Sequence, residues 1–152
     1  MMLADSAMSA FAEETSRQAH CARVLAVDDR GPFRDVLCDL VRAAPALDLL
    51  AAADSGESAV EAATRLDPDM VIMDVVMPGL GGIAAARLIK ATSPRTVVVL
   101  VSTTHPDDLS REGDDSLVAD AVVWKPHLRP RLLEELWFSH RRPTGPGISA
   151  PT

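Results

Sequence analysis

Five short apolar runs recur along the chain, and several of them are rich in β-branched residues. They cover residues 23–27, 47–53, 70–73, 96–101 and 121–124. Continuous apolar runs of this length are typical of strands that are buried on both faces of a sheet. The pattern therefore predicts five strands.

The segments between these runs show the helical period instead. They predict helices over 32–43, from Asp54 or Ser55 onward, over 81–91 and over 130–139. The acidic segment 107–116 predicts a short helix with few apolar anchors. The apolar stripes of the longer helices are Phe33, Val36, Leu37, Leu40 and Val41; Ala59, Val60, Ala63 and Leu66; Ile83, Leu88 and Ile89; and Leu132, Leu133, Leu136 and Trp137.

Strands and helices in strict alternation predict an α/β fold, a doubly wound five-stranded parallel sheet with helices on both faces. We assign this domain to residues 21–140. The Ala/Ser/Glu-rich residues 1–20 predict a mobile extension, and the Pro/Gly-rich residues 141–152 predict a disordered tail or a linker stub. The double methionine at the start favours a natural N-terminus. The other end leaves two alternatives open, a stand-alone domain or a protein that continues past the tail.

Composition narrows the functional classes. A chain of 152 residues with 47% hydrophobic and 24% charged residues fits one soluble domain. The net charge of -7 disfavours nucleic acid as the main partner. No apolar run approaches the ~20 residues that span a bilayer, and no secretory signal is evident, so a cytoplasmic location without membrane contact is the default expectation. Of the two cysteines, Cys38 is predicted to be a buried apolar residue rather than a reactive thiol.

Polar residues follow four of the five predicted strands. Asp28 and Asp29 follow the first strand, Asp74 the third, Ser102 the fourth and Lys125 the fifth. The carboxyl ends of parallel strands lie at one edge of the sheet, where ligands of such folds bind. We therefore expect three carboxylates, a hydroxyl and an ammonium group to meet in one crevice.

Three carboxylates at one point require a proton or a cation, because two unit charges ~4 Å apart repel by ~4 kcal/mol at an effective dielectric constant near 20. Carboxylate oxygens favour Mg²⁺ over zinc, and Mg²⁺ commonly recruits phosphate oxygens. Together with a lysine and a hydroxyl, it would form a clamp for a phosphoryl group in transfer. An Asp in that clamp can act as the nucleophile and form an aspartyl phosphate.

Four motifs in order resemble the receiver domain of two-component response regulators. They are the run from Val24 to Asp29, the run from Met70 to Gly79 with Gly82, then Ser102, and the pair Lys125-Pro126. The resemblance extends from about residue 23 to 139 and implies the flavodoxin-like receiver fold. Each motif alone is weak, whereas all four in this order, each closing an apolar strand, are specific.

The resemblance implies a role for each matched residue. Asp74 would accept a phosphoryl group from a histidine kinase or a histidine phosphotransfer protein. Ser102 and Lys125 would bind the phosphoryl oxygens, and the Lys125–Pro126 bond would be a candidate for the cis form. Residues implied to hold Mg²⁺ are Asp28, Asp29, Asp74 and, through its backbone carbonyl, Val76.

Less specific interpretations exist for these residues. Asp74 could be an ordinary loop acid, Asp28 and Asp29 could cap the helix that follows, and Lys125 could be a solvated surface residue. Their positions directly after apolar strands favour the site in each case. The hydroxyl could also come from Thr103 or Thr104, and the strand length favours Ser102.

One position departs from the family pattern. The residue three before the lysine, often Tyr or Phe in receivers, is Val122, so the switch that couples an aromatic ring to the hydroxyl of Ser102 lacks its ring. The sequence contains no tyrosine at all, and Trp124 precedes the lysine on the opposite face of the strand.

We therefore expect a Mg²⁺-dependent phosphoacceptor that signals through protein–protein contacts. Its downstream partner is unknown, a homodimer is possible, and we expect no direct DNA binding. It would catalyse its own phosphorylation and dephosphorylation and would not be an enzyme acting on a separate substrate. The main alternative is a pseudo-receiver, a binding or dimerisation scaffold that does not depend on phosphorylation. An aspartyl-phosphate phosphatase and an FMN-binding flavodoxin-like protein fit less well, because the first strand is not followed by two acids in alternate positions or by a hydroxyl-rich loop.

Overall fold

The structure is a computed structural model, and it describes residues 21–109 and 118–141 of the chain. Expectations for the extension 1–20, for most of the acidic segment and for the tail from residue 142 concern residues outside these ranges. The domain limits 21 and 140 accordingly remain predictions. None of the helices in the described ranges has the length and apolar character that crossing a bilayer requires.

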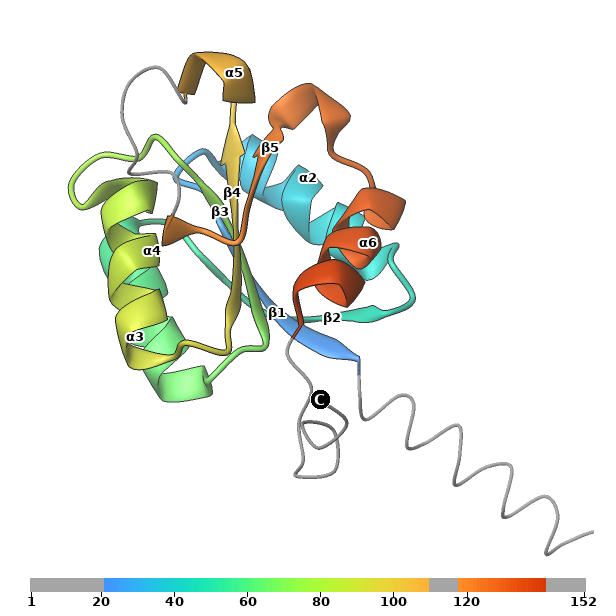
Figure 1. The fold of residues 1–152 in the computed structure, drawn as a ribbon, viewed down its shortest axis with the longest axis horizontal. Coiled ribbons are helices and arrows are strands. Elements are labelled where there is room, and N and C mark those ends of the chain that lie inside the picture. The colour runs from blue at the N-terminus through green and yellow to red at the C-terminus, as the bar shows by residue number, and fades with distance from the viewer. Residues whose placement is uncertain (1–20, 110–117, 142–152) are drawn as a thin grey trace, which may run out of the picture.

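The described elements follow the predicted order of strands and helices (Figure 1). Of the acidic segment predicted to form a short helix, the described residues up to 109 lie in helix α5, and a single 3₁₀ turn, η2, follows the last strand. In chain order the elements are β1 (Ala22–Val27), α2 (Gly31–Arg42), β2 (Leu47–Ala53), α3 (Gly56–Leu66), β3 (Met70–Asp74), α4 (Gly81–Thr92), β4 (Val97–Ser102), α5 (Pro106–Leu109), β5 (Ala121–Trp124), η2 (Lys125–His127) and α6 (Pro130–His140).

The sheet confirms the predicted fold class. Its five strands are parallel and lie in the order β2-β1-β3-β4-β5. The strand order reverses at β1, so β1 and β3 lie side by side and their following loops open at the centre of one edge. All residues of β3 and β4 are buried, in keeping with their continuous apolar sequences.

Two apolar layers fill the space on either side of the sheet. Helices α2 and α6 cover one face and α3 and α4 the other (Figure 1). Helices α2 and α6 contribute large residues such as Leu37 and Leu133 to their layer, whereas α3 and α4 contribute mainly alanines and Ile89 to theirs. The small side chains allow α3 and α4 to lie close to the sheet and to each other.

The predicted helix stripes are wider than the faces that the helices bury. Val36 of α2 and Leu88 of α4 were expected in the core, but they are 49% and 46% exposed. Each lies on a side of its helix that is turned away from the buried residues of that helix. Cys38 is buried as predicted, and its burial raises the pKa of its thiol.

An ion pair braces the edge of the sheet at which the strands begin. The Nζ atom of Lys90, in α4, lies 3.0 Å from Oδ2 of Asp120, and both side chains are largely buried. The same carboxylate oxygen accepts a hydrogen bond from the backbone N–H of Val98 at 2.8 Å, and the backbone N–H of Asp120 donates to the Val98 carbonyl. Asp120 therefore ties the start of β5 to both β4 and α4.

Candidate functional site

The three predicted acids meet at the carboxyl edge of the sheet. Asp28 follows β1, Asp29 comes next, and Asp74 ends the adjacent strand β3. One carboxylate oxygen from each lies within 4.8 Å of the other two. Asp28 is fully buried and Asp74 is 5% exposed. The topology thus gathers the acids as the sequence predicted.

The ammonium group of Lys125 lies between two of these carboxylates. Its Nζ is 3.3 Å from Oδ2 of Asp28 and 3.2 Å from Oδ2 of Asp74, and its side chain is 9% exposed. The lysine opens η2, which carries it from the end of β5 over the edge of the sheet. The bond to Pro126 is trans, so the expected cis form is wrong here; Pro126 lies inside the 3₁₀ turn, whose helical geometry a trans proline suits.

Backbone groups hold the remaining oxygens of Asp28 and Asp74. Oδ1 of Asp28 accepts from the N–H of Arg30 at 2.9 Å, and the Arg34 side chain donates to the Asp28 carbonyl at 2.8 Å. Oδ1 of Asp74 accepts from the N–H of Val76 at 3.2 Å. Both carboxylates are thereby oriented before any ligand arrives. The predicted role of the Val76 carbonyl as a metal ligand remains a prediction.

Asp29 supplies an unsatisfied atom. Its Oδ1 is buried and has no hydrogen-bond partner among the described residues. A buried carboxylate oxygen without a partner costs free energy, and a cation at this point would remove that cost. Together with the all-oxygen donor set of Asp28, Asp29 and Asp74, this atom fits a hard divalent ion such as Mg²⁺.

Burial raises the pKa of the Asp74 carboxyl, and the neighbouring Asp28 carboxylate raises it further. The Lys125 ammonium and the Val76 N–H oppose this shift without cancelling it. The positive charge of Lys125 alone is therefore not enough to balance the negative charge of the acids around it. A divalent cation would supply the rest and favour the ionised Asp74.

This pKa shift predicts how stability changes with pH in a chelator. The folded protein holds the Asp74 proton more tightly than the unfolded chain does, so ionisation costs no stability below the ordinary pKa of ~3.9. As the pH rises from the ordinary pKa to the raised pKa, ionisation of Asp74 lowers the free energy of unfolding, and the loss is complete above the raised pKa. Asp74→Asn has no ionisable group at this position and so does not lose this stability. Urea unfolding in EDTA should find the variant more stable than the wild type at pH 7, with the difference shrinking towards pH 4. A difference independent of pH would contradict the prediction.

The predicted hydroxyl is buried at the end of β4. Ser102 is 1% exposed, and its Oγ accepts from the N–H of Thr104 at 2.9 Å. Asp74 pairs with Val101 across the sheet, so Ser102 stands one residue further along the adjacent strand. The alternatives Thr103 and Thr104 are exposed. Ser102 is the hydroxyl of the three that the fold builds into the edge.

The loop after Asp74 depends on its glycines. Gly79 and Gly81 have positive φ angles of 78° and 76°, which side chains disfavour. Gly82 packs so closely on β3 that a Cβ atom there would overlap the carbonyl of Asp74. The carboxylate of Glu57, from α3, accepts a long hydrogen bond of 3.5 Å from the N–H of Leu80.

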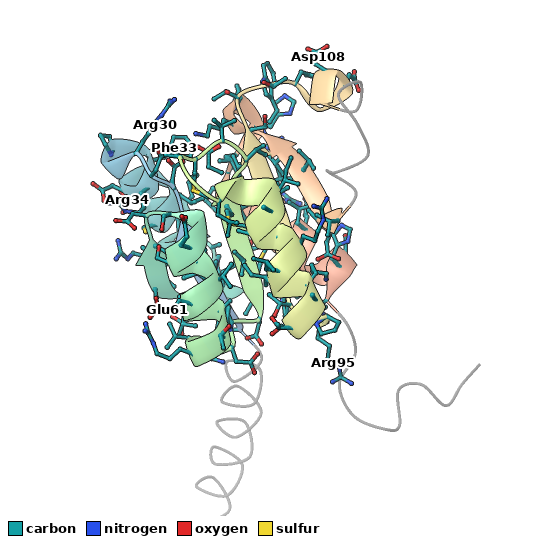
Figure 2. All side chains as sticks on the ribbon, turned by 90° about the vertical axis from the view of Figure 1, so that its left-hand side faces the viewer. Arg30, Phe33, Arg34, Glu61, Arg95 and Asp108 are labelled. Atoms are coloured by element: carbon teal, nitrogen blue, oxygen red, sulfur yellow. The ribbon has the colours of Figure 1, made fainter. Side chains whose placement is uncertain are left out.

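One contact of the site was missed by the sequence analysis. The aromatic ring of Phe33 lies under the Lys125 ammonium, with Nζ 3.9 Å from the ring centroid. Figure 2 shows Phe33 near Arg30 and Arg34 at the end of the molecule where α2 begins. The helical period placed Phe33 in the core stripe of α2. The signal that could have found it is its place in the first turn of the helix that follows Asp28 and Asp29.

Val122 occupies the position at which receiver domains often carry an aromatic switch residue. Val122 is half-buried and packs against the layer under α3 and α4. Trp124 instead lies at the edge, where its indole N–H donates to the Thr103 carbonyl at 3.1 Å. The rings of His105 and His127 contact it edge-on, with centroid distances of 5.3 and 5.0 Å. Trp124 thus ties the loop after Ser102 to β5.

Comparisons with known proteins agree with this geometry. The response regulator receiver domain family matches residues 24–136. A protein-glutamate methylesterase/protein-glutamine glutaminase of Shewanella frigidimarina is 38% identical over 104 residues, which are 68% of this chain and 26% of that protein. A homologous protein of the same description from Vibrio cholerae is 36% identical over 104 residues, 68% of this chain and 27% of that protein. The chain thus spans about a quarter of the length of these curated relatives.

Solved structures show the same likeness. The response regulator domain of Thermotoga maritima CheB is 33% identical, with a TM-score of 0.67, and the match covers 81% of this chain and 98% of that domain. A CheX-CheY complex with BeF3 and magnesium from Borrelia burgdorferi has a TM-score of 0.66 at 23% identity, with 80% and 90% of the two chains covered, and supports the fold alone.

Proposed function

The chain belongs to the response regulator receiver domain family, and on that premise we propose that it is a phosphoacceptor. Asp74 takes a phosphoryl group from a phosphohistidine of a histidine kinase or a histidine phosphotransfer protein. The observation that carries this proposal is the Lys125 ammonium between Asp28 and Asp74, beside the unpartnered carboxylate oxygen of Asp29. An ammonium group for the phosphoryl oxygens and an unpartnered carboxylate oxygen for a cation are the groups that phosphoryl transfer requires.

The transfer needs a nucleophile and a way to neutralise charge. A carboxylate oxygen of Asp74 forms the new bond to phosphorus while the bond from phosphorus to the imidazole nitrogen breaks, and the electron pair leaves with the nitrogen. The N–H of Val76 and the ammonium of Lys125 hold the Asp74 carboxylate in place. Lys125 can then turn a donor toward the phosphoryl oxygens, and the hydroxyl of Ser102 can donate to another of them.

Asp28, Asp29 and Asp74 would hold Mg²⁺. When bound, the ion neutralises part of the charge on the transferring phosphoryl group and on the acids that surround it. The role of Asp28 and Asp29 is to bind and orient. The backbone carbonyl of Val76 would complete the protein ligands.

Titration with beryllofluoride, which mimics a phosphoryl group on Asp74, tests this proposal. With Mg²⁺ present we expect a saturable change in tryptophan fluorescence, because Trp124 is hydrogen-bonded to Thr103 beside Ser102. Without Mg²⁺ the change should be absent, and Asp29→Asn should weaken it roughly tenfold or more, since a liganding charge is lost. If the amide signals in the nuclear magnetic resonance spectrum all stay unchanged at saturating beryllofluoride and Mg²⁺, the proposal is contradicted.

A scaffold that works without phosphorylation is the second candidate function. The observation that favours it is Val122, since a valine cannot swing inward as an aromatic ring can. The two functions predict different outcomes of the same titration. A scaffold would show no saturable change in any probe with beryllofluoride and Mg²⁺, whereas a phosphoacceptor would show one.

The output of the phosphoacceptor would be a protein–protein contact, with a downstream protein or with a second copy of the chain. We propose no direct DNA binding for this chain, because its net charge of -7 disfavours contact with phosphate backbones. The only chemistry that we propose for the chain is its own phosphorylation and dephosphorylation. We propose the cytoplasm as its location, because its phosphodonors act there.

A further inference from the structure

The Lys125 ammonium has three neighbours, and one of them is not an acid. Besides the carboxylates of Asp28 and Asp74, it lies 3.9 Å from the centre of the Phe33 ring. A cation this close to an aromatic face is attracted by the ring quadrupole, and the attraction grows when water is excluded. The lysine side chain is 9% exposed, so little water competes at this site.

The ring differs from the two acids in what happens to it during phosphoryl transfer. Phosphorylation converts the Asp74 carboxylate into an acyl phosphate, which changes the charge that faces Lys125. Asp28 is expected to share its charge with a bound cation. The Phe33 ring is neutral before and after transfer, so its attraction for the ammonium is the one contact of Lys125 among the described residues that keeps its character throughout.

The backbone gives Phe33 a defined position under the lysine. It lies in the first turn of α2, which starts at Gly31 directly after the Asp28–Arg30 turn, and Pro32 restricts that first turn. Arg34, next along the helix, donates to the Asp28 carbonyl at 2.8 Å. The segment that places one acid of the site therefore also places the ring.

We infer that Phe33 is a positioning residue that holds the Lys125 ammonium by its aromatic face and so speeds phosphorylation of Asp74. This inference rests on the proposed function. A long lysine side chain has many rotamers, and holding its end in place before the phosphoryl group arrives lowers the entropy that the transition state must lose.

Nuclear magnetic resonance tests the contact itself without any phosphorylation. The sequence holds two lysines, Lys90 and Lys125, so protein labelled with ¹³C at lysine Cε gives two well-identified signals. Nuclei above the face of an aromatic ring are shielded by it, so removing the ring shifts their signals downfield. We expect the Lys125 Cε signal to move downfield in Phe33→Leu and to keep its position in Phe33→Tyr, while the Lys90 signal stays unchanged in both variants.

Phosphorylation kinetics test the role. With acetyl phosphate and Mg²⁺, Phe33→Leu should be slowed roughly three- to tenfold, and Phe33→Tyr should restore most of the rate. Site-specific 4-fluoro-, 3,5-difluoro- and 3,4,5-trifluorophenylalanine at position 33 should slow it in that order, because each fluorine weakens the ring quadrupole while the ring keeps its shape. Phe138→Leu, which removes an exposed ring from α6, is the matched control and should leave the rate unchanged.

The outcomes separate two failures. A Lys125 signal that does not move in Phe33→Leu, or equal rates across the fluorinated series, would overturn the inference while the wild type is still phosphorylated. A wild type that is not phosphorylated at all would overturn the proposed function first, before any Phe33 variant is compared. A moved signal together with a graded series supports the positioning role.

Discussion

Asp74→Asn is expected to abolish phosphorylation by acetyl phosphate and by any phosphohistidine donor. The amide is nearly the same size as the carboxylate, but it is neutral and is a very poor nucleophile toward phosphorus. The measurement is incorporation of an acid-labile phosphoryl group, followed by intact-protein mass spectrometry. The fold should survive, because the Val76 N–H can still donate to the Asn oxygen that replaces Oδ1.

Asp54→Asn is the matched control for that experiment. Asp54 follows β2 at the same edge of the sheet, but it is exposed and lies outside the group of three acids. We expect this variant to be phosphorylated like the wild type. Retention of the phosphoryl group in Asp74→Asn, or its loss in Asp54→Asn, would contradict the assignment of Asp74.

Gly82→Ala is expected to lower the free energy of unfolding by roughly 2–4 kcal/mol. The added methyl group would overlap the Asp74 carbonyl, and backbone atoms of β3 cannot move aside as a flexible side chain can. Helix α4 would have to shift away from the sheet, and the Gly82 N–H would lose its 2.9 Å hydrogen bond to the Val75 carbonyl. Denaturant unfolding followed by circular dichroism measures this loss.

Gly31→Ala provides the comparison for Gly82. Both glycines lie at the start of a helix, but a Cβ atom at Gly31 would meet only the end of the Arg34 side chain, at 3.8 Å. We expect its free energy of unfolding to rise or to change by less than about 1 kcal/mol, since alanine restricts the unfolded chain. Equal losses in the two variants would show that close approach to β3 is not the cause.

The sheet and its acids were predictable from the sequence because both depend on short-range patterns. The strands are largely apolar runs, and a polar residue at or directly after the end of each run breaks it at a defined position. Parallel topology then brings Asp28, Asp29 and Asp74 together regardless of their distance along the chain. The same argument placed Lys125 correctly at the carboxyl edge of the sheet, beside these acids.

Side-chain contacts between distant elements were not predictable in this way. Whether Phe33 faces the core or the site depends on how α2 is rotated against the sheet, and helical periodicity alone allows both. The exposure of Val36 follows from the same rotation. The trans bond before Pro126 depends on the turn that follows β5, which has no distinctive sequence pattern.

The anchor at Asp120 has a consequence for how the site could move. Its carboxylate and backbone hold the start of β5 through bonds to Lys90 and Val98, and a slide of the strand by one residue would break all of them. Because β5 is only four residues long, these bonds fix the register of the whole strand against β4. The tryptophan at its end and the lysine after it can therefore shift along the strand direction only after these bonds are broken.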